Sequence, residues 1–326
     1  MGKTALITGA LGQDGTLLSE HLAALGYRIV GVVRAPPIKG AENAVELVTA
    51  NLCDRVEVGR LLERWQPDEI YHLAAYHHSA QDNLQGASVA AKQRTLDTNF
   101  GITQTLAFAL LEAGSKSSLV FAGSSQMYTG SSATDPISEQ TPRRPATFYG
   151  HVKSWAADLL TRLRADLGLR AGTAILFNHE SPLRGSQFVS RKITQAAAAI
   201  RAGKSVPLEI ANTAARVDWC SAKDVVRALH LMAEAPTAGD YVIASGTLHS
   251  VEELLQTAFD HCGLDWRAHT KSQFARVESA LCGDPRLIET TLGWRRSMTF
   301  EQMIQEMVDH DIKLCSINGS RGLSAG

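Results

Sequence analysis

The 326 residues are enough for about two domains, or for one large domain with an appendage. Hydrophobic residues make up 44% of the chain and charged residues 20%, which is the ordinary composition of a globular protein. The formal net charge of −1 excludes a long-range attraction to nucleic acid or to an anionic membrane, so any phosphate-bearing ligand must be held by local groups.

The five cysteines are scattered and form no Cys-x-x-Cys pair. This pattern argues against a disulfide framework or a zinc site and indicates a reducing compartment. The first fifteen residues predict a strand and a glycine loop rather than a signal peptide, and no apolar stretch approaches the roughly 18 residues that span a bilayer. We therefore expect a cytoplasmic protein with neither a membrane nor a nucleic-acid partner.

Short apolar segments alternate with longer helical patterns through the first half of the chain. Strands are predicted at residues 3–8, 28–33, 46–52, 69–73, 118–122 and 172–177, and helices at 13–25, 89–113 and 148–167. Buried apolar strands separated by helices are typical of a parallel, doubly wound sheet. The predicted fold class is therefore α/β, with a Rossmann-type domain over residues 1–177.

After residue 178 the alternation weakens. Helices are predicted at residues 189–202, 223–234, 251–262, 285–292 and 299–310, with one strand at 240–245. We interpret residues 178–315 as a smaller, mainly helical substrate lobe over the carboxyl edge of the sheet, where ligands of such sheets bind. The small and polar residues 316–326 are expected to form a flexible tail.

The segment between the first strand and the first helix reads T-G-A-L-G-Q-D-G. Glycines at this spacing let the backbone turn tightly and approach a pyrophosphate, while the next helix points its amino end at the negative charge. The alternative is a purely structural turn. The candidate cofactor residues of this loop are Gly9, Gly12, Gln13, Asp14 and Gly15.

Two further positions bear on the cofactor. Arg34 follows the second strand, and no Asp or Glu occurs between residues 24 and 40, where NAD-binding proteins usually carry an acid for the ribose. An arginine there suits the 2′-phosphate of NADP, so NADP is predicted over NAD; a solvated loop arginine is the alternative. Asp54, after the third strand, can accept the adenine amino group or simply cap a helix.

Tyr149 and Lys153 lie four residues apart at the start of a predicted helix and therefore share a face. A neighbouring ammonium favours the phenolate form of a tyrosine, which otherwise has a pKa near 10 and is a poor base at neutral pH. Ser124 ends the preceding strand and can hydrogen-bond the hydroxyl from which Tyr149 takes a proton. An ordinary tyrosine–lysine helix face is the alternative.

Together with Asn51–Asp54, His72-Leu73-Ala74-Ala75 and Asn99, these motifs resemble those of the extended short-chain dehydrogenases. Within that group the chain is most similar to the GDP-mannose 4,6-dehydratase family, over about residues 3–312. The opening L-I-T-G with G-Q-D-G, the segment L-F-N-H-E-S-P at 176–182, and D-W at 218–219 carry the likeness.

The resemblance implies an NADP-dependent enzyme that oxidises the hexose of a GDP-sugar at C4 and forms a homo-oligomer, a dimer or a tetramer. It implies that Leu73, Ala74 and Ala75 line the cofactor, and that Arg34, His179 and Arg184 hold its phosphates and ribose. It implies that the substrate's nucleotide diphosphate is held by Asn178, Val189, Lys192, Arg216 and Arg276. Without the resemblance, His179 would be a packed loop histidine and Lys192 a solvated one on a helix.

The chain departs from the family where a dehydratase has a glutamate that removes the proton at sugar C5. That position is Gln126, whose amide is no base near neutral pH. His77 and His78 are the candidate substitutes. The loop associated with tetramer contacts is replaced by residues 35–39, and the basic residue before Asp218 is Val217.

Three functions therefore stay open. The resemblance favours a dehydratase, and the active-site chemistry favours a GDP-4-keto-sugar reductase or epimerase. A non-catalytic NADP-binding regulatory protein on the same fold is the third hypothesis, although such proteins typically lose the tyrosine–lysine pair that this chain keeps.

Overall fold

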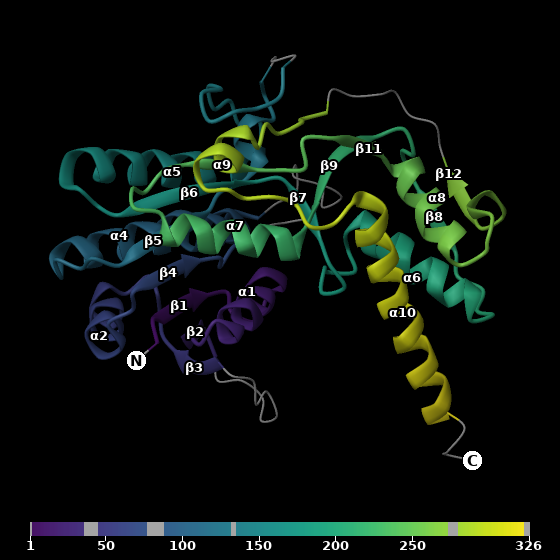
Figure 1. The fold of residues 1–326 in the computed structure, drawn as a ribbon, viewed down its shortest axis with the longest axis horizontal. Helices are drawn as coiled ribbons and strands as arrows, with labels where there is room; N and C mark the ends of the chain where they lie inside the picture. The colour runs from purple at the N-terminus through teal and green to yellow at the C-terminus, as the bar shows by residue number, and fades with distance from the viewer. Residues whose placement is uncertain (1, 36–44, 77–87, 132–134, 273–279, 323–326) are drawn as a thin grey trace. The chain divides into compact units, whose positions relative to one another are not determined.

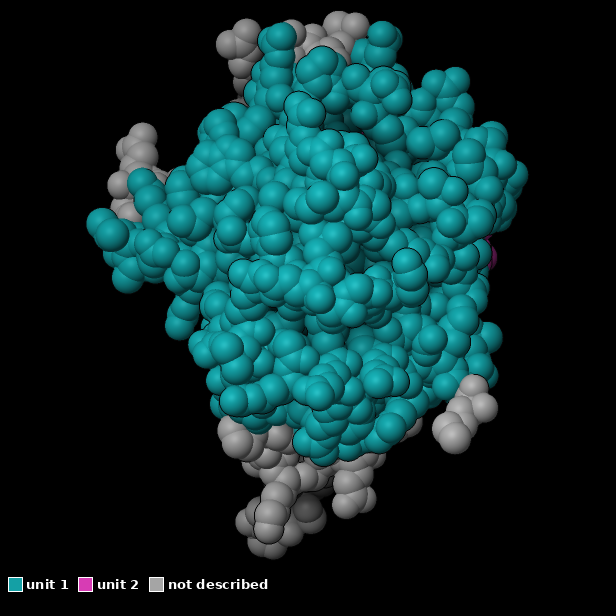
Figure 2. All heavy atoms as spheres, turned by 90° about the vertical axis from the view of Figure 1, so that its left-hand side faces the viewer, with its two compact units in different colours: residues 1–177, 222–244, 283–295 teal, residues 178–221, 245–282, 296–326 magenta. Residues whose placement is uncertain are grey.

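The computed structural model describes residues 2–35, 45–76, 88–131, 135–272 and 280–322 (Figure 1). The chain forms two compact units, each built from three separate segments. Unit 1, coloured teal in Figure 2, comprises residues 1–177, 222–244 and 283–295. Unit 2 comprises residues 178–221, 245–282 and 296–326.

Two segments within the predicted lobe of residues 178–315 group with unit 1. Residues 222–244 and 283–295 belong to unit 1, because β10 (Tyr241–Ile243) extends the large sheet and helix α7 (Ala222–Glu234) packs against its strands. The sequence predicts a helix and a strand at these places, but it does not show that both belong with the large sheet of unit 1.

Unit 1 contains a seven-stranded parallel sheet in the order β10-β6-β5-β4-β1-β2-β3. Besides β10, its strands are β1 (Thr4–Thr8), β2 (Arg28–Val33), β3 (Val45–Thr49), β4 (Glu69–His72), β5 (Ser118–Ala122) and β6 (Ala171–Leu176). The central strands are buried on both faces, with Leu6, Ile70 and Phe121 at most 1% exposed, which explains their continuous apolar sequences. The predicted doubly wound α/β fold class is confirmed.

Helices cover both faces of this sheet. Helices α1 (Gln13–Ala24) and α7 pack against each other on one face. Helices α2 (Arg55–Trp65), α4 (Ile102–Glu112) and α5 (Phe148–Leu167) pack on the other, around a shared apolar core. The short helices α3 (Val89–Leu96), η3 (Ser125–Tyr128) and α9 (Arg286–Thr291) complete the unit.

The helix predicted over residues 89–113 is confirmed as helical structure from Val89 to Glu112, with a change of helix type inside it. A π-helical turn, η2 (Asp97–Gly101), separates α3 from α4. Turns of this type widen the helix by one residue and often occur at functional sites. Helix α2 was not predicted from the sequence. Its N-cap, Asp54, was considered as a residue that could cap a helix.

Unit 2 contains two small sheets and three longer helices. The sheet strands are β7 (Asn178–Glu180), β9 (Arg216–Ser221) and β11 (Leu248–Ser250) in one, and β8 (Leu208–Ile210) and β12 (Thr270–Ser272) in the other. Helices α6 (Val189–Arg201), α8 (Val251–His261) and α10 (Phe300–Gly322) surround an apolar core, with the short η4 (Trp266–Ala268) beside them.

Helix α10 continues to Gly322, so residues 316–322 of the predicted tail are helical. The helix is anchored by buried Met307 and Val308, and by an ion pair in which Arg191 of α6 holds Asp311 (Nη2–Oδ1 2.8 Å). Among the residues that the structure describes, no helix combines the length and apolarity needed to cross a bilayer.

Candidate active site

The glycine loop follows β1 and is packed too closely for other residues. Gly9 has a φ of +72°, and a Cβ there would lie 2.8 Å from the backbone nitrogen of Ala74. A Cβ on Gly15 would lie 2.3 Å from the carbonyl oxygen of Gly9. Gly12 is the N-cap of α1, so no side-chain cap covers the first amides of this helix. The amino end of α1 is therefore able to receive an anion such as a pyrophosphate.

Thr8 connects the end of β1 with the end of β4. Its Oγ1 accepts the N–H of Ala74 at 3.1 Å and lies 2.8 Å from Nδ1 of the buried His72. Burial lowers the pKa of His72 to about 3, with the nearby Lys153 charge adding to the effect. The imidazole is therefore neutral, and its Nδ1 shares a hydrogen bond with the Thr8 hydroxyl. This pair holds the backbone of Leu73 and Ala74 beside Gly9; sequence reasoning gave Thr8 no role, although it directly precedes the glycine.

Asn99 fixes the far end of the same segment. It lies in the π-helical turn and is fully buried. Its Nδ2 donates to the carbonyl oxygens of Tyr76 (3.0 Å) and Thr95 (2.9 Å). The resemblance named Asn99 without a role, and the structure shows that it positions the chain that leaves β4 after Ala75.

Tyr149 and Lys153 lie in the first two turns of α5, whose N-cap Thr147 accepts the N–H of Gly150 at 3.0 Å. The Lys153 side chain is 1% exposed, and its Nζ donates to the carbonyl oxygen of Ala122 at 2.7 Å. The same Nζ lies 5.6 Å from the centre of the half-buried Tyr149 ring. Burial lowers the pKa of Lys153 to about 7. The helix therefore places the buried Lys153 amine beside the phenol.

Ser124 and Gln126 follow β5 and are brought against α5 by Gly150. Ser124 Oγ accepts the N–H of Gln126 at 3.2 Å and caps η3. A Cβ on Gly150 would lie only 2.3 Å from the carbonyl oxygen of Gln126. Because Gly150 is the residue after Tyr149, this contact sets the distance between η3 and the tyrosine. Gly150 was not identified from the sequence. A glycine inside a predicted helix, next to the candidate base Tyr149, could have indicated this close contact.

The two positions considered for the rest of the cofactor are exposed. Arg34 directly follows β2. Asp54 caps α2, because its Oδ1 accepts the N–H groups of Val56 (2.8 Å) and Glu57 (3.2 Å). Asp54 therefore has the structural role that was one of its two interpretations, and the adenine contact stays a prediction.

The remaining candidates lie in unit 2. Asn178 and His179 belong to β7, and Val189 and Lys192 to the first turn of α6. The two elements are joined by a hydrogen bond from Ser190 to Glu180.

Arg184 lies between them. Its guanidinium is 3.6 Å from the centre of the Phe188 ring and 3.4 Å from Glu180 Oε2. Arg216 begins β9 and donates to the carbonyl oxygen of Leu248 at 3.0 Å. Arg276, His77 and His78 lie outside the described residues.

A parallel sheet of this order, with a glycine loop after β1 and a Tyr-x-x-x-Lys helix beside the end of β5, defines an enzyme of the extended short-chain dehydrogenase type. The sequence profile of the family described as GDP-mannose 4,6 dehydratase matches residues 6–307. The chain belongs to the GDP-mannose 4,6-dehydratase family.

Individual proteins agree with this assignment. The chain is 35% identical to GDP-mannose 4,6 dehydratase 1 of Arabidopsis thaliana, over 96% of this chain and 90% of that protein. The structure of RMD from Pseudomonas aeruginosa complexed with NADPH aligns with a TM-score of 0.78 at 21% identity, over 96% of this chain and 99% of that one. UDP-glucose 4-epimerase from Thermotoga maritima, with UDP-glucose, aligns with a TM-score of 0.82 at 20% identity, over 95% and 99%. The last two likenesses concern the fold alone.

Proposed function

We propose that the chain is an NADP-dependent enzyme that oxidises the hexose of a GDP-sugar at C4. The buried Lys153 ammonium beside Tyr149 carries this proposal, because it supplies the positive charge that turns the phenol into a base. The hypothesis of a non-catalytic protein is set aside, because the chain belongs to an enzyme family and keeps both residues.

The side chains divide the chemistry between them. Tyr149 removes the proton of the C4 hydroxyl, and Lys153 stabilises the phenolate. Ser124 Oγ accepts the N–H of Gln126, so its own proton is directed to another acceptor, which we assign to the substrate oxygen. A bound oxidised nicotinamide would supply the acceptor for the hydride of C4. The Tyr149→Phe variant should lose about 10²- to 10⁴-fold in turnover while binding cofactor normally; wild-type turnover would contradict the proposal.

The cofactor phosphates are assigned to the amino end of α1 and to Arg34, with His179 and Arg184 as further candidates. The exposed Arg34 supports NADP over NAD, because a guanidinium suits a 2′-phosphate. Calorimetric titration of stripped protein should show tighter binding of NADP. Arg34→Ala should lose roughly 1.5–3 kcal/mol of NADP affinity and almost none of NAD affinity. Equal effects on both cofactors would contradict the assignment.

The substrate's diphosphate is assigned to four residues, with Arg276 as an addition: Asn178, Val189, Lys192 and Arg216. The names of the relatives support GDP as the nucleotide. Ligands stabilise a protein by mass action, so thermal melts with GDP, UDP, CDP and ADP compare the bases directly. Stabilisation by UDP and not by GDP would refute this part of the proposal.

Gln126 decides which reaction follows the oxidation. Elimination of water across C5 and C6 needs a base for the C5 proton, and a neutral amide cannot act as one. The second candidate function is therefore a GDP-4-keto-sugar reductase or epimerase, which needs Ser124, Tyr149 and Lys153 but no carboxylate at position 126.

The two functions are separated by one pair of variants. GDP-mannose and NADP⁺ are incubated with three proteins: the native protein, Gln126→Glu and Gln126→Met. The products are identified by NMR and mass spectrometry. Gln126→Glu keeps the side-chain shape and adds a base, so 4-keto-6-deoxy product should rise by about 10²-fold or more. Gln126→Met, which is of similar size and has no base, should show no rise. Rapid dehydration by the native protein would mean that another group, with His77 and His78 first, supplies the base.

We also propose a cytoplasmic location and a homo-oligomer, a dimer or a tetramer. The five cysteines are scattered and form no Cys-x-x-Cys pair, which supports a reducing compartment. The oligomer rests on the family resemblance, and light scattering coupled to gel filtration measures it directly. A monomer at micromolar concentration would contradict this expectation.

A further inference from the structure

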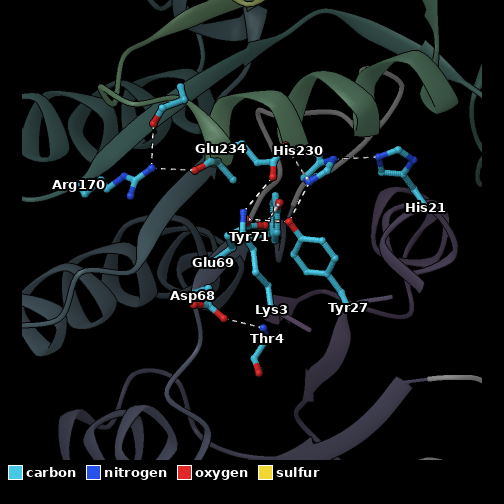
Figure 3. A network of polar contacts seen from close by, with 12 residues as sticks. Lys3, Thr4, His21, Tyr27, Asp68, Glu69, Tyr71, Arg170, His230 and Glu234 are labelled. Carbon is cyan, nitrogen blue, oxygen red and sulfur yellow. Dashed lines mark hydrogen bonds and ion pairs between the residues drawn. The ribbon is translucent and has the colours of Figure 1, made fainter. Parts of the chain in front are cut away.

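A cluster of titratable side chains, drawn in Figure 3, lies at the amino edge of the sheet. The glycine loop follows the carboxyl end of β1, at the other edge. Glu69 is the first residue of β4, while Lys3 and Tyr27 directly precede β1 and β2. His230 and Glu234 come from the last two turns of α7. The proposed reaction uses none of these residues.

Three of these residues, Glu69, His230 and Glu234, have side-chain atoms that can bind a metal ion and that lie close together. Glu69 Oε, His230 Nε2 and Glu234 Oε all lie within 4.8 Å of each other. His230 and Glu234 are four residues apart on one face of α7, with Nε2 and Oε2 3.5 Å apart. Ligands held at 2.0–2.2 Å by a tetrahedral zinc ion are separated by about 3.4 Å. A small contraction of the cluster therefore reaches the spacing of such a site.

Each buried ligand already has an outer partner that orients it. The Tyr71 hydroxyl donates to Glu69 Oε2 at 2.7 Å, which leaves Oε1 for the cluster. His230 Nδ1 lies 3.1 Å from Nε2 of His21. A proton on Nδ1 donated to His21 leaves the lone pair of His230 Nε2 directed at the carboxylates. Metal-bound histidines and carboxylates characteristically have partners of this kind.

The centre of the cluster already holds a cation. Lys3 Nζ lies 3.0 Å from Glu69 Oε1 and 2.9 Å from Glu234 Oε1. The Lys3 side chain is 45% exposed, so its ammonium can turn out into solvent when a metal ion replaces it beside the buried Glu69. A cavity of about 690 Å³, lined by Lys3, Glu69 and Glu234 among others, gives access from solvent.

We propose that Glu69, His230 and Glu234 bind a divalent transition metal ion such as Zn²⁺, with Lys3 as the competing cation of the metal-free state. Two carboxylates and an imidazole are a ligand set that zinc accepts. Water, or the Tyr27 oxygen at 3.0 Å from both Glu69 Oε1 and His230 Nε2, fills the fourth position. The ion ties β4 to α7 and has a structural role. Cysteine spacing gives no sign of this site, because its ligands are Glu and His.

The test uses the full chain without an affinity tag, from which a chelator has removed bound metal. Zn²⁺ binding is measured near neutral pH by calorimetric titration and by thermal melts at increasing Zn²⁺ concentration. The native protein should bind one Zn²⁺ that Glu234→Gln and His230→Gln weaken by at least about tenfold. Lys3→Met should bind about tenfold more tightly, because the competing ammonium is gone.

A second His–Glu pair supplies the control. His249 and Glu253 are also four residues apart, with Nδ1 and Oε2 2.9 Å apart, but no third ligand joins them among the described residues. His249→Gln should therefore bind Zn²⁺ like the native protein.

Two results would overturn the proposal: absence of binding to the native protein at millimolar Zn²⁺, and equal affinities of native protein, Glu234→Gln and Lys3→Met. Glu234 is 44% exposed, so Glu234→Gln decides the question even if His230→Gln folds poorly.

Discussion

Gly150→Ala tests whether the contact between α5 and η3 positions the active site. The added Cβ would lie 2.3 Å from the Gln126 carbonyl oxygen, which belongs to the backbone and cannot rotate away. An ordinary contact of 3.4 Å requires about 1.1 Å of displacement between the two elements. Overpacking of this kind typically costs about 1–3 kcal/mol of unfolding free energy.

The same displacement moves Tyr149, the preceding residue, relative to Ser124. A misplacement of about 1 Å at a reacting group can cost about 10²-fold in rate. We therefore expect Gly150→Ala to lower both stability and turnover, measured by denaturant titration and by steady-state oxidation of the GDP-sugar.

Gly59 provides the matched control, because it also lies within a helix, α2, and a Cβ there meets nothing within 4 Å. Gly59→Ala should raise the unfolding free energy by about 0.5–1 kcal/mol and leave turnover unchanged. Native turnover and native stability in Gly150→Ala would show that α5 and η3 are free to separate, and would refute the argument.

Two further predictions concern Thr8 and Lys153. Thr8→Val leaves the N–H of Ala74 and Nδ1 of the buried His72 without a partner, so it should cost about 1–3 kcal/mol of stability and weaken cofactor binding. Thr8→Ser should retain both the stability and the binding. Equal unfolding free energies and equal cofactor affinities in the two variants would contradict the role of the hydroxyl. The pKa of Lys153 is about 7 in the fold and 10.5 when unfolded, so between these values the unfolded chain binds more protons and stability rises with pH. Thermal melts of native protein and Lys153→Met across this range should show the native stability increasing relative to the variant; a constant difference would mean that Lys153 keeps an ordinary pKa.

The local structure of unit 1 was predictable because its signals are local. Residues 28–33, 118–122 and 148–167 form elements with the predicted bounds. The strands are apolar on both faces, and the long helix starts after a capping threonine and ends at Gly168 with a φ of +68°. The glycine loop, Ser124, Tyr149 and Lys153 could be named as candidates for the same reason, since spacing within a few residues defines their motif.

The tertiary structure alone decided what depends on the path of the backbone between distant residues. Sequence periodicity cannot show that β10 lies beside β6, or that strands as short as β7 and β11 form at all, because three residues carry too little pattern. Two contacts join residues that are 24 and 161 positions apart: that of Gly150 with Gln126, and that of Glu69 with His230. The neutral state of His72 depends on its complete burial. Such contacts and such burial arise only when several elements pack together, so no single stretch of the sequence records them.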